Sequence, residues 1–315
     1  MKSDLKLQAP KPYFERIRNL QGVRVPKNIF LVLLLFWVYI FCTIYLEQII
    51  YFVISIAAQI CGYNIAENID LELSVELFLT LVSIALTLVC CKFIDNRPFR
   101  TMYLTRGKFL RHYLTGALLG FAMMSAVILM AWCGGAIQFE GMQPLRHPFM
   151  MLLMFAGWLI QGFSEELSFR GWLMTSAGTH HSVWLAVAAN SICFALVHAS
   201  NDGFAVFPAV NLVLFGLTAS LLVLRTGSLW GAAALHSLWN WAQGNFFGMQ
   251  VSGIPSGSTV LRFTQTQKAE WLGGGEFGLE GGAGTTVVLL AAVAILLLMP
   301  QRTEHDTEDM TNGTV

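Results

Sequence analysis

The sequence has few charged residues and no excess of either sign. Of its 315 residues only 12% are charged and 55% are hydrophobic, the mean hydropathy is +0.60, and the formal net charge is zero. An ordinary soluble domain has about 25% charged residues, so this composition excludes that class and predicts a protein that crosses a membrane several times. Because the basic residues flank apolar runs, anionic lipid is the expected partner for them, and no nucleic-acid role is assigned.

Other features are missing as well. The six cysteines include no C-x-x-C spacing, so neither a disulfide framework nor a zinc knuckle is indicated. We find no repeat of fixed period, and the longest hydrophilic stretch between apolar runs, 248–283, has 36 residues, too few for a further domain. The first apolar run follows 28 mostly polar residues and exceeds the length of a signal-peptide core, so we expect an uncleaved insertion signal.

Long apolar runs are what the sequence has in abundance. A helix of about 20 residues crosses a bilayer, and eight such runs lie at 29–60, 73–94, 110–133, 148–175, 183–200, 208–225, 229–247 and 284–300. The first and fourth runs are longer than one crossing needs, so we expect them to be tilted, to extend beyond the bilayer or, for the first, to break near Glu47. The predicted fold class is therefore all-α, a polytopic transmembrane helix bundle with about eight spans.

The positions of the basic residues predict the topology. Of 19 Lys and Arg residues, seven precede the first run and six lie between the second and third, which places both segments in the cytoplasm. With eight spans, both termini are then cytoplasmic. The expected organisation is a basic N-terminal segment (1–28), N-terminal spans (29–147), a core (148–247), a Gly-rich loop with the last span (248–300), and a disordered tail (301–315).

One apolar run contains three ionisable residues within six positions. Each such group costs at least ~2.5 kcal/mol at membrane depth, so Glu165, Glu166 and Arg170 require a polar interior. On a helix, Glu166 and Arg170 are four residues apart and can form an ion pair, while Glu165 points elsewhere. This spacing predicts one structural carboxylate and one available as a general base. A purely structural ion network is the alternative.

Two later apolar runs carry the remaining candidates. His198 ends one run and can exchange protons or bind a metal, and the alternative is an interfacial histidine that is hydrogen-bonded near a helix end. His236 and Asn240, again four residues apart, project from one helix face, where both can donate hydrogen bonds to a developing oxyanion. Together with Glu165 these groups predict a site that activates water for hydrolysis, although interhelical hydrogen bonding alone would also explain His236 and Asn240.

These motifs have a family resemblance. In this order, E-E-x-x-x-R, F-x-x-x-H and H-x-x-x-N on successive apolar segments resemble the CPBP intramembrane proteases, the CAAX proteases and bacteriocin-processing enzymes also called the Abi group. The resemblance covers about 148–247, and the Gly-rich stretch 276–282 looks like a tail of bacterial members. The resemblance implies a conical intramembrane cavity. In it, Glu165 and His198 would activate water, and His236 and Asn240 would stabilise the oxyanion. Glu166, Arg170 and Phe194 would support them.

Metal dependence is left open by the sequence. Catalytic zinc commonly has three protein ligands, and Glu165, His198 and His236 are candidates; many members of the family are labelled metalloproteases. The sequence has no H-E-x-x-H motif, and a Glu and His pair can activate water unaided. A zinc cofactor therefore remains an alternative to a metal-free reaction.

The leading hypothesis is an intramembrane, CAAX protease-like endopeptidase of a bacterial plasma membrane. Its substrate would be a membrane-embedded or lipid-proximal peptide, in export, bacteriocin processing or immunity. One alternative is a non-catalytic scaffold or immunity protein that binds the transmembrane segment of a partner. Another is a proton-coupled carrier in which Glu165 and His198 form a relay, and the missing internal repeats disfavour it.

Overall fold

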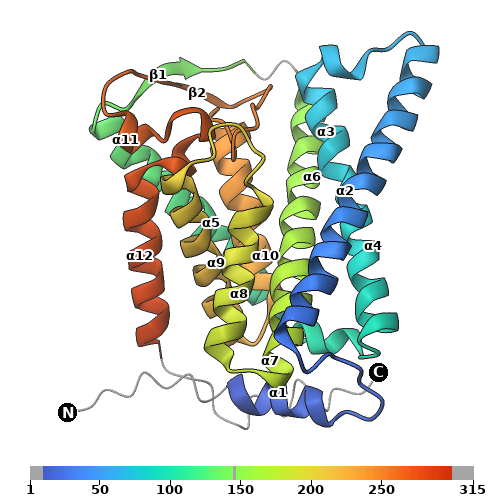
Figure 1. The fold of residues 1–315 in the computed structure, drawn as a ribbon. Helices are drawn as coiled ribbons and strands as arrows, with labels where there is room; N and C mark the ends of the chain where they lie inside the picture. Colours follow the sequence, from blue (N-terminus) through green and yellow to red (C-terminus); the bar gives the residue numbers. More distant parts are fainter. Residues whose placement is uncertain (1–9, 145–146, 300–315) are drawn as a thin grey trace.

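The computed structural model describes residues 10–144 and 147–299, and this part of the chain is a helix bundle with one small sheet (Figure 1). The helices are α1 (Pro10–Asn19), α2 (Ile29–Ile60), α3 (Ile69–Leu79), α4 (Leu81–Val89), α5 (Phe109–Cys133), α6 (Pro148–Glu166), α7 (Met174–His180), α8 (Val183–Val197), α9 (Val206–Thr226), α10 (Leu229–Trp241), α11 (Glu270–Gly273) and α12 (Ala283–Leu298). The strands are β1 (Ile137–Met142) and β2 (Leu261–Gln265).

Within the described residues, four helices are long and apolar enough to cross a membrane. They are Ile29–Ile60, Ile69–Ile94, Phe109–Cys133 and Val206–Thr226, with two shorter apolar helices at Val183–Val197 and Ala283–Leu298. The prediction of an integral membrane helix bundle is confirmed to this extent. The predicted disordered tail, 301–315, lies outside the described residues.

The first span is one continuous helix. Asn28 begins α2 by accepting a hydrogen bond from the backbone N–H of Phe30, 2.8 Å away. The next 32 residues contain neither Gly nor Pro, so nothing interrupts the backbone hydrogen bonds. The break considered near Glu47 is therefore wrong.

The all-α prediction missed the sheet. β1 and β2 pair antiparallel, and a bulge between Phe139 and Gly141 disturbs their register. The rings of Phe139 and Phe263 lie 5.1 Å apart across the pair. Two strands of five or six residues, separated by 118 residues of chain, leave no long alternating pattern to detect.

The bundle has two distinct ends. The sheet and α11 lie at one end, and α1 lies across the other, where it packs against α7 (Figure 1). The ring of Tyr13 in α1 stacks on Tyr103, with centroids 4.2 Å apart, and its hydroxyl donates to the carbonyl of Arg100. The described parts of the two basic segments therefore lie at the same end of the molecule.

Helix α10 lies at the centre and packs against α5, α6 and α9. Its contact with α5 is a close approach of backbones. A Cβ added at Gly116 or Gly120 would overlap the carbonyl oxygen of Gly231 or Leu235, respectively. Small residues allow such contacts between membrane helices, and here they fix the helix that carries His236.

We expect Gly120→Ala to destabilise the protein by about 1–3 kcal/mol, the usual cost of overpacking. The added methyl group would collide with backbone of α10, which cannot move aside as a flexible side chain can. Thermal unfolding in detergent measures the effect. Gly107→Ala is the matched control, because a Cβ there meets no atom within 4 Å. Equal melting temperatures for the two variants would contradict the close-packing account.

Candidate functional site

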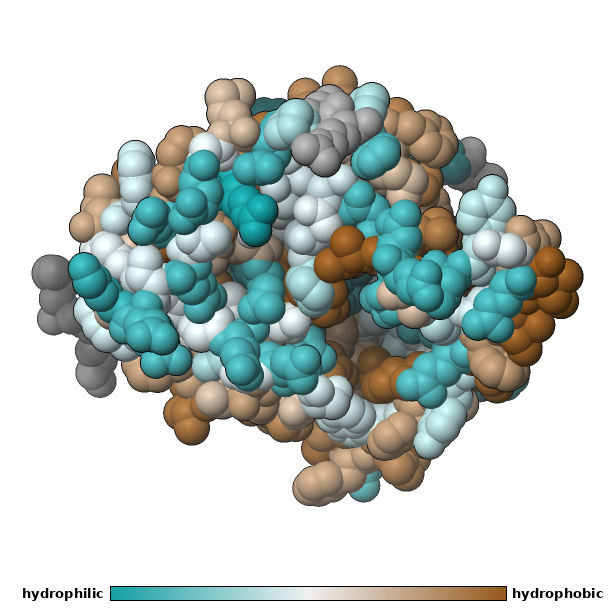
Figure 2. Space-filling model, turned by 90° about the horizontal axis from the view of Figure 1, so that it is seen from above, coloured by the Kyte–Doolittle hydropathy of each residue, from teal (hydrophilic) through white to brown (hydrophobic). Residues whose placement is uncertain are grey.

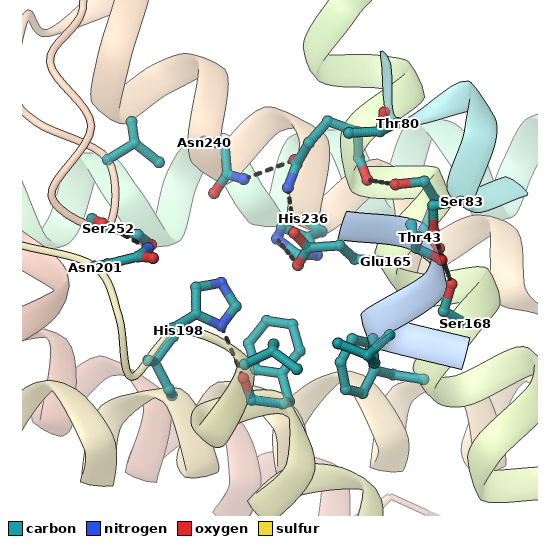
Figure 3. Close-up of a pocket in the computed structure, with 18 of the residues that line it drawn as sticks. Thr43, Thr80, Ser83, Glu165, Ser168, His198, Asn201, His236, Asn240 and Ser252 are labelled. Carbon is teal, nitrogen blue, oxygen red and sulfur yellow. Dashed lines mark hydrogen bonds and ion pairs between the residues drawn. The ribbon is translucent and has the colours of Figure 1, made fainter. Parts of the chain in front are cut away.

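A cavity of about 260 Å³ lies among α2, α6, α8, α9 and α10. Glu165, His198, His236 and Asn240 all line it, so the structure brings the four predicted catalytic residues to one place (Figure 3). Phe194 lines it as well, whereas Glu166 and Arg170 lie behind its wall and are fully buried. Seen from the end that carries the sheet, the molecular surface is mainly hydrophilic and hollowed near its middle, with apolar side chains in the hollow (Figure 2).

The short connection between α7 and α8 explains how Glu165 and His198 reach a similar depth. α6 continues through a π-helical segment, Leu167–Leu173, into α7, which ends at His180; Val183 then begins α8. Glu165 lies 16 residues before His181, and His198 lies 16 residues after Ser182. The two helices therefore carry both side chains back to a similar level.

Glu166 holds two other motif residues. Its Oε1 accepts hydrogen bonds from Arg170 Nη1 at 2.8 Å and from His236 Nδ1 at 2.9 Å. Because an ionised carboxylate only accepts, Nδ1 is the protonated nitrogen of His236. Nε2 then faces Glu165, with 3.8 Å between Nε2 and Oε2. Glu166 thus fixes the ring of His236 as well as pairing with Arg170.

Gln161 links the remaining two motifs, and sequence reasoning missed it. Its Nε2 donates to Glu165 Oε1 at 2.6 Å, while its Oε1 accepts from Asn240 Nδ2 at 3.1 Å. Gln161 precedes Glu165 by four residues, a spacing that could have identified it. The other carboxylate oxygen of Glu165 is shielded and accepts no hydrogen bond from the described residues. One oxygen is therefore held and the other is available.

His198 caps the C-terminal end of α8. Its Nδ1 lies 2.8 Å from the carbonyl oxygen of Phe194, which can only accept, so Nδ1 carries the proton and Nε2 of the neutral ring is free to accept one. The Phe194 ring contacts the imidazole, with centroids 4.9 Å apart, and the Arg170 guanidinium lies over the same ring at 4.5 Å. Phe194 therefore orients His198 and Arg170 together.

Two of the π-helical segments adjoin the motifs. Glu166 directly precedes the segment Leu167–Leu173, and Asn240 lies two residues before a second segment, Ala242–Phe246. A π turn widens the helix locally and re-aims its side chains, and such turns are frequent at functional sites. Nothing in the apolar spacing indicated either one.

The Gly-rich loop forms part of the cavity wall. Glu280 is 7% exposed; its Oε1 accepts from Trp239 Nε1 at 3.0 Å, and its Oε2 accepts from the backbone and hydroxyl of Ser252. Asn211 of α9 donates to the carbonyls of Glu280 and Gly282. The segment therefore packs against α9 and α10 rather than lying apart from the bundle.

The three candidate zinc ligands line one cavity but are not placed to share a metal ion. Among the described residues, no group of three or more His, Cys, Asp or Glu side chains is placed to hold a metal ion. Nδ1 of His198 bonds to the carbonyl of Phe194, and Nδ1 of His236 bonds to Glu166. Of the three candidates, Glu165 and His236 are the two that lie close together. The donor set does not fit a three-ligand site.

Part of the chain matches a known protein family. A search of curated proteins finds no match. Residues 147–242 match the family model described as type II CAAX prenyl endopeptidase Rce1-like. This stretch contains all three motifs and most of the cavity wall, and the match supports a CAAX-type intramembrane protease at the level of the family. Residues 147–242 are therefore similar to the Rce1-like type II CAAX prenyl endopeptidases, which confirms the resemblance of this stretch to the CPBP intramembrane proteases.

Proposed function

We propose that this protein is an intramembrane endopeptidase that hydrolyses a peptide bond of a membrane-associated substrate. The observation that carries the proposal is the cavity in which Glu165, His198, His236 and Asn240 meet, inside a bundle of apolar helices. Ionisable groups at such depth are costly and mark functional sites. The family match over residues 147–242 supports the same class of reaction.

In the proposed reaction, a water molecule lies between the free oxygen of Glu165 and Nε2 of His198. Glu165 accepts a proton as the water oxygen bonds to the carbonyl carbon of the scissile peptide. The same proton then passes to the nitrogen of the leaving amine as the C–N bond breaks. The products are a carboxylic acid and an amine, so no other reactant is needed.

The oxyanion of the tetrahedral intermediate would be stabilised by His236 and Asn240. Asn240 has a second amide hydrogen beyond the one that it gives to Gln161. A His236 ring with protons on both nitrogens would keep its bond to Glu166 through Nδ1 and donate through Nε2. Glu166 and Arg170 support the ring, and no step is assigned to a metal.

The proposal includes the topology. We propose eight spans, with the shorter helices α6, α8, α10 and α12 crossing beside the four long ones, around a conical cavity. The end that carries α1 would face the cytoplasm of a bacterium, with both termini on that side and anionic lipid at the basic segments.

The first test is cleavage of a quenched-fluorescent membrane-peptide library by purified protein in liposomes, with and without a chelator. We expect cleavage by the wild type and a loss of at least a hundredfold in His198→Ala, because the group that holds the attacking water opposite Glu165 is removed. His147→Ala is the matched control, since His147 is exposed and lies outside the cavity.

The outcome also separates the alternatives. If wild type and His198→Ala are equally silent while both fold and both restore the phenotype of a knockout strain, the proteolytic proposal fails and the scaffold or immunity role replaces it. Loss of wild-type cleavage on chelation would show a metal requirement, which the proposed mechanism does not contain.

A further inference from the structure

Glu47 is an ionisable residue in the cavity that the proposed mechanism does not use. It is the only Asp, Glu, Lys, Arg or His in the 32 residues of α2. It lines the same cavity as Glu165 and lies close enough for the two carboxylates to interact electrostatically. A carboxylate in a membrane helix is costly, so its retention calls for a partner.

Glu47 belongs to a polar stripe on α2. Tyr39, Thr43, Glu47 and Tyr51 follow one another at intervals of four residues, so they share one helix face. The hydroxyl of Tyr39 bonds to three hydroxyls of neighbouring helices, that of Thr43 to the carbonyl of Tyr39, and that of Tyr51 to Glu72. By contrast, Oε1 of Glu47 is shielded and accepts no hydrogen bond from the described residues.

The surroundings of Glu47 are rich in acceptors and poor in positive charge. The lining includes three glutamates, Glu47, Glu165 and Glu280, and no Lys or Arg among the residues that the structure describes. The hydroxyls of Thr43, Thr80 and Ser83 lie on the Glu165 side of the cavity, across from His198, Asn201 and Ser252 (Figure 3): these six frame the space. An entering ammonium or guanidinium group would supply the missing donors.

From these observations we propose that Glu47 is a specificity-determining residue that binds a Lys or Arg side chain of the substrate near the bond to be cleaved. This inference rests on the proposed function. The carboxylate would take one donor of the cation, and the hydroxyls of Thr43 and Ser83 would take others. A shielded carboxylate oxygen left without a donor is an incomplete site, and a cation beside it would complete it.

The test uses transmembrane peptides that differ at one position, which carries Lys, norleucine or Glu and is moved along either side of the cleaved bond. When the variable residue occupies the position that meets Glu47, wild-type protein in liposomes should cleave the Lys peptide with a kcat/KM at least tenfold higher than that of the norleucine peptide. Glu47→Gln should reduce cleavage of the Lys peptide at least tenfold more than that of the norleucine peptide. Glu47→Lys should reverse the preference toward the Glu peptide.

Glu76→Gln is the control, because Glu76 is exposed on the neighbouring helix α3 and does not line the cavity. It should keep the wild-type preference. The proposal is overturned if Glu47→Gln slows both peptides equally, which indicates a structural role, or if it changes neither.

A binding measurement separates this proposal from the function on which it rests. Fluorescence anisotropy of labelled peptides is followed with His198→Ala protein, with and without Glu47→Gln. Preferential binding of the Lys peptide that needs Glu47, with no cleavage by the wild type, supports the subsite and removes the protease. Cleavage without any Glu47-dependent preference, in binding or turnover, leaves the protease and removes the subsite.

Discussion

Glu165→Gln is expected to lower kcat/KM for a cleaved membrane peptide by a factor of about 10²–10⁴. This range is the usual contribution of a positioned general base, and glutamine keeps the shape of the side chain while losing its capacity to accept a proton. The oxygen that matters is the one that accepts no hydrogen bond, since Gln161 holds the other. Initial rates in liposomes, compared with the wild type, give the factor.

The fold should survive this change. The Glu165 side chain is 24% exposed and takes part in no buried ion pair with Arg170, so the melting temperature in detergent should stay near that of the wild type. Glu76→Gln makes the same chemical change outside the cavity and should retain activity. An active Glu165→Gln protein would assign the base elsewhere and overturn the mechanism.

Arg170→Met should have the largest effect on stability, about 3–5 kcal/mol, which is the typical cost of removing one partner of a buried ion pair. Arg170 and Glu166 are both fully buried, so among the described residues the remaining carboxylate would keep only its hydrogen bond from His236. The loss is measured as a lower melting temperature and a lower yield of folded protein. Arg262→Met, at an exposed position of β2, is the control.

A double variant tests the cause of this loss. Glu166→Gln combined with Arg170→Met removes the unpaired charge and should recover much of the stability, although His236 would keep a weaker acceptor. If the double variant is no more stable than Arg170→Met alone, the cost comes from lost packing of the guanidinium over Phe194 and not from a buried charge.

Much of the site could be predicted because charged residues are rare in this sequence. Glu165, Glu166 and Arg170 are conspicuous in an apolar run, and the spacing of four residues correctly predicted the ion pair of the last two. Gln161 was missed because an uncharged amide does not stand out. Its role depends on Asn240, which is 79 residues away in the chain and adjacent only in the fold.

The fold was predicted less completely, for physical reasons. Hydropathy detects a segment long enough to cross the membrane, but it carries no information on π turns, which arise from local register and side-chain packing. It also gave no reason to expect α1, whose Tyr13, Phe14 and Ile17 pack below α7 within a segment that its basic residues mark as polar. Hydropathy likewise cannot predict contacts between residues that are far apart in the chain.

The glycines around Glu280 have a consequence for sequence variation. Gly274 and Gly278 have positive φ angles, and a Cβ on Gly274, Gly278 or Gly282 would strike backbone atoms of the same loop or of neighbouring residues. A stretch whose composition suggests a permissive linker would then tolerate replacement as poorly as the centre of the bundle does. In a saturation survey of this protein, the map of intolerant positions should extend beyond residues 147–242 to include this loop, and inherited diversity there should be correspondingly low.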